Sequence, residues 1–132
     1  MSHTTLQPDG WARPKGYANG VVARGRTIFL AGQIGWDAEQ RMVGSDLVTQ
    51  ARQALQNIVA ILAEDHAKPE HIVRLTWYVT DRAAYLAAGA ALGAAYREVM
   101  GRHFPAMTAV EVCSLMEADA VVEIEATAVV PE

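Results

Sequence analysis

The sequence predicts an α+β domain with a mixed sheet, in the order β-β-α-β-α-β-β. Two segments, 47–62 and about 82–100, carry the apolar spacing or the alanine content of helices. Segments before, between and after them alternate apolar and polar residues, which is typical of strands. The second helix joins two of these strands as a crossover, so part of the sheet is parallel and the helices lie on one face.

Length and composition indicate a single domain over residues 1–132. Hydrophobic residues make up 52% and charged residues 20% of the chain, which is ordinary for a globular protein and slightly on the apolar side. The excess hints that another subunit covers part of the surface. Pro, Gly and Asn are frequent in the first 20 residues, and we expect an extended arm over 1–16.

Charge and cysteine usage limit the partners. The net charge is −4 and Lys and Arg do not cluster, so we expect no nucleic acid partner. The single cysteine, Cys113, forms no internal disulfide and suits a reducing cytoplasm; we expect it to be buried. Neither a signal-peptide pattern nor a membrane span is found, and the four histidines lack metal-ligand spacing.

The first half of the chain predicts a hairpin and a helix. The segments "GVVA" (20–23) and "TIFLAGQIG" (27–35) flank "RGR", as in a β-hairpin whose turn contains glycine. Helix 47–62 begins after an N-cap at Ser45 or Asp46. Its apolar stripe consists of Leu47, Ala51, Ala54, Leu55, Ile58 and Leu62.

The second half predicts three strands and one helix. "HIVRLTWYVT" (71–80) alternates as a strand, and Asp81 then caps an alanine-rich helix that runs to about Met100 and stops at Gly101. "AMTAVEV" follows Pro105, and a turn at 118–120 leads into "VVEIEATAVVPE" (121–132).

The two faces of the predicted sheet differ in composition. One is aliphatic and belongs under the helices. The other mixes Phe29, Met107 and Ala109 with Thr, Tyr, Gln and Glu. Such a face is too apolar for water and too polar for a dry core. It predicts a subunit interface that contains a wet cleft.

The chemistry-bearing candidates each have a structural alternative. Glu123 and Glu125 point to one face of the last strand; they are either solvent-facing residues or include a general base, since a carboxylate in a partly dry cleft suits proton transfer. Gln33 follows Gly32, which leaves room for a ligand or marks a strand bulge. Tyr17 lies at the end of the N-terminal arm, where a tyrosine is more often a packing residue than a catalytic one.

Six segments together resemble the RidA/YjgF family, from Gly16 to Val130. They are "GYANGV", "LAGQIG", "QARQALQNIVAIL", "LTWYVTD", "FPAMTAVEV" and "VEIEATAV". The resemblance implies a chorismate-mutase-like fold and a homotrimer whose sheets line a central barrel, with clefts between subunits. It also implies hydrolysis of reactive enamines or imines with release of ammonia and without a cofactor. Older family labels are endoribonuclease L-PSP and translation inhibitor.

The same resemblance assigns roles to particular residues. Glu123 matches the family's water-activating glutamate, Tyr17 a cleft tyrosine, and Gly32 the glycine of a strand-end loop. The chain departs from the pattern at Met107, where deaminating members carry an arginine that binds the substrate carboxylate, and at Ala109, which replaces a frequent cysteine. This argues against a small 2-imino acid as the substrate.

The sequence therefore predicts a hydrolytic deaminase of an enamine or imine, with Glu123 catalytic. The substrate would lie against Tyr17, Gly32, Gln33, Met107 and Ala109. The alternative is a non-catalytic homotrimer that binds a small metabolite or a partner. Ribonuclease activity is disfavoured by the charge. Cations that would replace the missing arginine are Arg24, Arg26 and Arg102.

Overall fold

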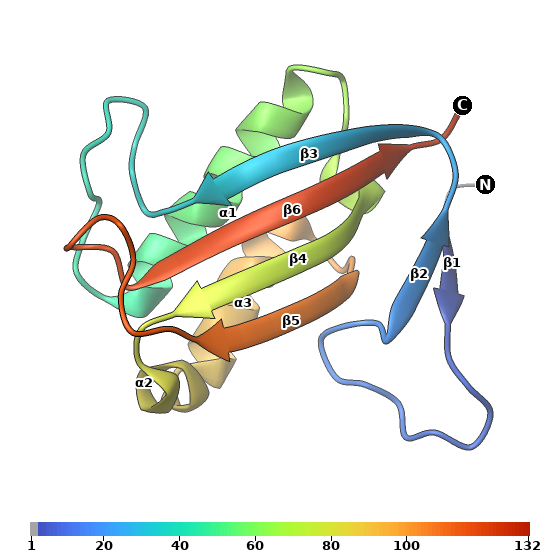
Figure 1. Ribbon diagram of the computed structural model, residues 1–132, viewed down its shortest axis with the longest axis horizontal. Coiled ribbons are helices and arrows are strands. Elements are labelled where there is room, and N and C mark those ends of the chain that lie inside the picture. The colour runs from blue at the N-terminus through green and yellow to red at the C-terminus, as the bar shows by residue number, and fades with distance from the viewer. Residues whose placement is uncertain (1–2) are drawn as a thin grey trace.

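A four-stranded mixed sheet forms the centre of the molecule. The computed structural model describes residues 3–132. The strand order is β3-β6-β4-β5, in which β6 runs antiparallel to both neighbours and β4 and β5 are parallel (Figure 1). The α+β class and the mixed sheet are thus confirmed. The strands are β3 (Arg26–Gln33), β4 (Ile72–Val79), β5 (Ala106–Glu111) and β6 (Val122–Val130).

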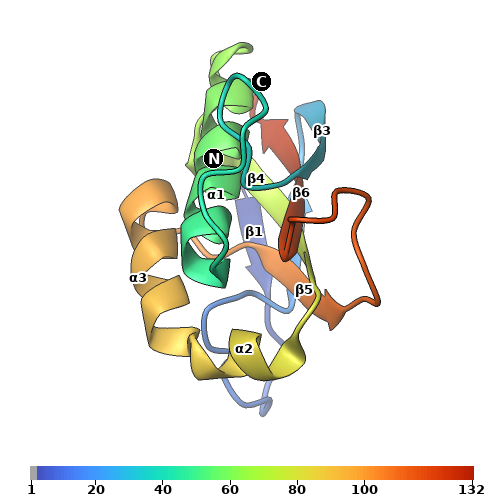
Figure 2. The same cartoon turned by 90° about the vertical axis from the view of Figure 1, so that its left-hand side faces the viewer.

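The helices cover one face of this sheet, as predicted (Figure 2). The N-cap of the first helix is Asp46, whose side chain accepts a hydrogen bond from the Thr49 amide. The predicted second helix is divided at Ala88, which has φ −91° and ψ 10° and precedes Gly89, a residue of low helix propensity. The helices are α1 (Leu47–Ala63), α2 (Arg82–Ala87) and α3 (Gly89–Met100), with a short 3₁₀ turn η1 (Pro69–His71).

The core lies between the sheet and helices α1 and α3. The inward faces of β4 and β6 supply Leu75, Val122 and Ile124, which have no exposed surface. The predicted stripe of α1 packs against them through Leu55 and Ile58, both also 0% exposed. Because these aliphatic side chains leave water completely, their burial is the main force that holds the helices on the sheet.

The predicted hairpin between 20–23 and 27–35 is wrong. Strand β2 (Gly20–Ala23) pairs with β1 (His3–Leu6) in a separate two-stranded sheet, whereas β3 pairs with β6. At Gly25 φ is +146°, and a Cβ there would lie 2.0 Å from the Val130 carbonyl oxygen. Glycine therefore directs the chain onto the end of β6 rather than back along β2. The expected extended arm contains β1; residues 1 and 2 lie outside the described part.

Cys113 is exposed, so its predicted burial is also wrong. It follows the end of β5, in the connection to β6, where the helices no longer cover the chain. The alternation of β5 does not extend to this position because the strand ends at Glu111. Among residues 3–132, no helix is both long and apolar enough to cross a membrane.

Candidate functional site

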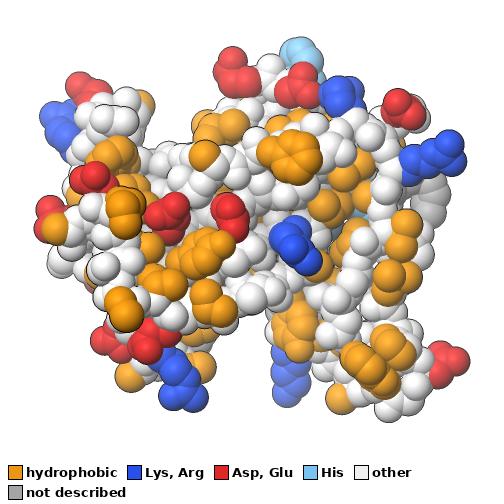
Figure 3. Space-filling view, in the orientation of Figure 1, with side chains coloured by type: hydrophobic (Ala, Val, Ile, Leu, Met, Phe, Trp, Pro, Cys, Tyr) orange, Lys and Arg blue, Asp and Glu red, His pale blue; other side chains and the backbone are white. Residues whose placement is uncertain are grey.

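The face of the sheet away from the helices carries the paired carboxylates. In the register of the strands, Glu123 lies beside Tyr78 and Glu125 beside Thr76. Phe29 of β3 belongs to the same face and is 81% exposed. Figure 3 shows acidic and basic side chains mixed with large hydrophobic ones over this surface. The face is thus part apolar and part polar, but of the three apolar residues predicted for it only Phe29 is there.

The two carboxylates have different surroundings. The Tyr78 hydroxyl donates a hydrogen bond of 2.5 Å to Oε1 of Glu125. This bond, together with desolvation and the nearby negative charges, raises the pKa of Tyr78 and keeps the phenol protonated. No side chain or backbone amide of residues 3–132 binds the Glu123 carboxylate in this way. Among residues 3–132, Glu125 thus has one side-chain hydrogen-bond partner and the Glu123 carboxylate has none.

Glu123 lies in a cavity of about 360 Å³ where β3 ends and β6 begins. Gly32 shapes it: a Cβ at this position would lie 2.0 Å from Oε2 of Glu123, so only glycine lets the carboxylate rest against the backbone. The register of β3 against β6 shifts between Leu30 and Gln33, which is the bulge that the sequence allowed for. The cavity is lined by Gly32, Gln33, Ile34, Trp36, Gln40, Asn57, Met116, Glu117 and Glu123.

Helix α1 fixes the far wall of this cavity. The Asn57 side-chain amide donates to the carbonyl oxygens of Ile34 (3.2 Å) and Trp36 (2.8 Å). These bonds hold the loop after β3 against the helix. The Gln33 amide, in turn, donates to the Ala31 carbonyl at 3.1 Å. Sequence reasoning missed Asn57, although it belongs to the "QARQALQN" segment that carried part of the family resemblance.

Met107 and Ala109 lie on the other face of the sheet, contrary to the prediction. Met107 pairs with Leu75 and Ala109 with Trp77, and both partners are buried under the helices. Side-by-side residues of paired strands share a face. The alternation of the sequence shows that Met107 and Ala109 share a face, but it does not show which face. Strand β5 lies at the edge of the sheet, and its two faces are similar in apolar content.

A second cavity, of about 380 Å³, contains Met107. It lies between β5 and the helices α2 and α3, and residues Lys15 and Gly16 of the arm reach its mouth. Tyr17 follows directly and is 39% exposed; neither Tyr17 nor Ala109 lines either of these two cavities. One chain therefore brings Glu123, Gly32 and Gln33 together and holds Met107 apart from them.

The cations near Met107 differ from the candidates that we named from the sequence. Arg26 donates to Asp65 at 2.8 Å, at the end of α1, and neither Arg24 nor Arg102 lines the Met107 cavity. Lys15 and Arg97 do line it. The sequence does not predict that Arg97 lines this cavity. Arg97 is a single charged residue on a helix, and the direction in which it points depends on how the helix packs.

Replacing Gly32 with alanine should abolish most of any reaction that depends on Glu123 while leaving the fold intact. The added methyl group would occupy the position of the carboxylate, and the flexible glutamate side chain would have to turn away. We expect the melting temperature to change by no more than a few degrees, because the displaced atoms are the far end of a side chain. Unchanged turnover would show that the Glu123 position is not used.

Comparison with known proteins shows the family of this chain. Residues 11–130 match the protein family described as Endoribonuclease L-PSP. A 2-iminobutanoate/2-iminopropanoate deaminase from Salmonella typhimurium is 35% identical over 132 residues, covering 98% of each chain. A RutC family protein from Pyrococcus abyssi is 35% identical over 117 residues, covering 88% of each chain.

Solved structures show the same fold. The Rid protein YyfB from Yersinia pestis, described as of unknown function, superposes with a TM-score of 0.86 at 32% identity; the match covers 98% of this chain and all of that one (100%). Rv2704 from Mycobacterium tuberculosis, of the YjgF/YER057c/UK114 family, gives a TM-score of 0.65 at 30% identity and covers 98% and 100%. The chain belongs to the RidA/YjgF/L-PSP family, as its sequence segments predicted.

Proposed function

We propose that the protein is a hydrolytic deaminase of a reactive enamine or imine, with Glu123 as the group that activates water. The observation that carries the proposal is the Glu123 carboxylate, which rests against the Gly32 backbone in an open cavity without a hydrogen-bond partner among residues 3–132. Relatives named as 2-iminobutanoate/2-iminopropanoate deaminases support it at about 35% identity.

The reaction needs only water and one base. Water adds to the C=N carbon while Glu123 takes its proton, and the proton then passes to nitrogen. The resulting carbinolamine loses ammonia as the C–O bond becomes a carbonyl, so an imine and water give a carbonyl compound and ammonia. An enamine first tautomerises to the imine by proton transfer at carbon. A positioned base contributes about 10²–10⁴-fold to such steps, and no cofactor is required.

The site is proposed to form between copies of the chain. Within one chain Glu123 and Met107 lie on opposite faces of the sheet, so a substrate that touches both must contact two chains. The face that carries Glu123 also exposes large apolar side chains, such as Phe29 at 81% and Val110 at 41%. An exposed mixed face of this kind marks a protein interface. We propose a homotrimer with one cleft at each interface.

The alternative is a homotrimer that binds a metabolite without converting it. Met107 and Ala109 favour it, because the position of the family's carboxylate-binding arginine is apolar here. An arginine bound to a carboxylate contributes about 1.5–3 kcal/mol. Its loss weakens binding of a small 2-imino acid about a hundredfold, but it does not remove Glu123. The two functions differ in one measurable product, ammonia.

Mixing two inactive variants tests both the chemistry and the shared site. Glu123→Gln lacks the base, and Met107→Glu repels an anionic substrate from the other wall. If each site takes one wall from each of two subunits, re-association of an equal mixture should restore about a quarter of the wild-type sites. Ammonia release is measured above the buffer rate, on imines that an amino-acid oxidase generates from a panel of amino acids.

Sedimentation of the same samples reports the assembly. Recovery in the mixture, with a trimer in the centrifuge, is the expected result. A mixture as inactive as its components would refute the shared site. No ammonia above the buffer rate for wild type on any imine of the panel would remove the deaminase proposal and leave the binding alternative.

A further inference from the structure

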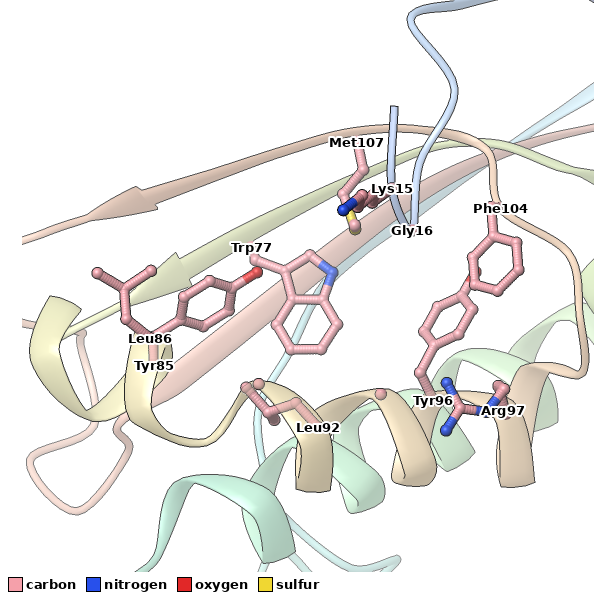
Figure 4. Close-up of a pocket in the computed structure, with 12 residues that line it drawn as sticks. Lys15, Gly16, Trp77, Tyr85, Leu86, Leu92, Tyr96, Arg97, Phe104 and Met107 are labelled. Atoms are coloured by element: carbon pink, nitrogen blue, oxygen red, sulfur yellow. The ribbon is translucent and has the colours of Figure 1, made fainter. Parts of the chain in front are cut away.

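The cavity beside Met107 has in its wall a buried hydrogen-bond donor that no group in the described part of the chain accepts from. Trp77 is 4% exposed, and its indole Nε1 has no hydrogen-bond partner among residues 3–132. Buried N–H groups are nearly always paired, because leaving one unpaired costs more than the bond itself contributes. Figure 4 shows the indole nitrogen on the side of the ring toward Met107 and Gly16. The donor thus lies on the side of the ring that faces other lining residues of the cavity.

The charges around this cavity all have one sign. Lys15 and Arg97 line it, and no aspartate or glutamate of the described residues does. Neither cation forms an ion pair within residues 3–132. Figure 4 places Lys15 at the Met107 end and Arg97 at the opposite end, beside Tyr96. One such cation at each end of the cavity, with the N–H donor near Lys15, favours an anionic ligand with oxygen acceptors.

The walls of the cavity are aromatic. Trp77 and Tyr85 meet edge to face with ring centroids 6.1 Å apart, and Tyr96 and Phe104 are stacked at 5.5 Å. Burial raises the pKa of Tyr85 and keeps its hydroxyl neutral. Gly89 widens the space, because a Cβ there would meet nothing within 4 Å. A cavity of about 380 Å³ with such walls would be mostly empty around a ligand of three or four carbons.

We propose that this cavity binds a carboxylate that carries an aromatic ring, and that the imine substrate belongs to this class. The carboxylate accepts from Trp77 Nε1 and lies near Lys15, while the ring lies among the aromatic side chains. Lys15 and Trp77 then bind the carboxylate of the substrate. The family resemblance assigns this role to an arginine at the position of Met107. The choice of substrate rests on the proposed deaminase function; the binding of the carboxylate does not.

The first experiment observes the Trp77 indole directly. The ¹⁵N–¹H resonance of Nε1 is assigned by its loss in Trp77→Phe and is followed during titration of the full-length protein with 3-phenylpropionate, which has no imine to hydrolyse. We expect a saturable downfield shift, because the donor gains a charged acceptor. Propionate and 3-phenylpropionamide separate the two halves of the ligand and should each bind about tenfold more weakly or worse.

Two variants test the site without relying on Trp77. Gly89→Leu fills the cavity from the start of α3, and we expect it to weaken 3-phenylpropionate at least tenfold. Ala90→Leu is the matched control, since Ala90 is exposed and does not line the cavity; it should bind as wild type does. Equal affinity in wild type, Gly89→Leu and Trp77→Phe would overturn the proposal, as would an indole resonance that 3-phenylpropionate does not move.

Turnover then separates this proposal from the deaminase function. Imines generated from phenylalanine and from alanine are compared in the ammonia assay, and the phenylalanine imine should have the higher kcat/KM, with the preference lost in Gly89→Leu. Hydrolysis of the alanine imine alone, with no binding of 3-phenylpropionate, would refute the aromatic carboxylate site but support the deaminase function. Binding of 3-phenylpropionate without hydrolysis of any imine would support the carboxylate site and refute the deaminase function.

Discussion

Replacement of Glu123 by glutamine should lower the rate of ammonia release by about 10²–10⁴-fold, the range that a positioned base supplies. Glutamine keeps the size of the side chain and its fit against Gly32, but it cannot accept the proton of water. Because the change is nearly isosteric, we expect KM and the state of assembly to stay close to wild type. The loss should appear in kcat, measured with saturating imine and corrected for hydrolysis in buffer.

Glu125→Gln is the matched control two residues along the same strand. Its side-chain oxygen can still accept the hydrogen bond from the Tyr78 hydroxyl, which Glu125 receives at 2.5 Å. We therefore expect activity within a few-fold of wild type. Equal losses in the two variants would mean that the negative charge of the face matters rather than one base. An undiminished rate in Glu123→Gln would exclude the catalytic role.

Replacement of Gln50 by leucine should lower the free energy of unfolding by roughly 3 kcal/mol or more. Gln50 lies on the buried side of α1 and is 0% exposed. Its amide donates to the carbonyl oxygens of Gly44 and Asp119, both at 2.9 Å, and its oxygen accepts from the Val121 amide at 2.8 Å. Leucine fills similar space but removes the partner of three backbone groups in part-buried hydrogen bonds. A group that water cannot reach then costs about 1–3 kcal/mol.

Urea unfolding followed by circular dichroism measures this loss. Gln56→Leu is the control, since Gln56 is exposed on the same helix and should change stability by about 0.5 kcal/mol or less. Gln50 also ties α1 to the residue that precedes β6, the strand of Glu123. We therefore expect faster amide exchange at Val121 in the Gln50 variant. A midpoint as high as that of wild type would show that water replaces all three bonds.

Gln50 links the family's sequence pattern to the architecture. The segment "QARQALQN" contains both Gln50 and Asn57, one turning toward the loop before β6 and the other toward the loop after β3. The Glu123 cavity lies between these two loops. The polar residues of an otherwise apolar helix face thus position the site rather than take part in its chemistry.

Elements that depend on local periodicity and caps could be predicted from their own segments. The stripe of α1, the alternation of β4 and β6 and the Asp46 cap repeat a pattern within one segment, and each was found where it was expected. Alternation also placed Glu123 away from the core, because its neighbours Val122 and Ile124 require burial. These features follow from solvation and short-range geometry, which a single segment contains in full.

Which distant segments pair could not be predicted from local patterns. Strand β2 pairs with β1 because Gly25 diverts the next strand onto β6, a contact more than 100 residues away in the chain. Met107 faces the helices because it aligns with the buried Leu75 in the parallel register of β5 and β4, and the Trp77 indole lies on the same side. Register depends on the free energy of packing distant residues together, which no local pattern records.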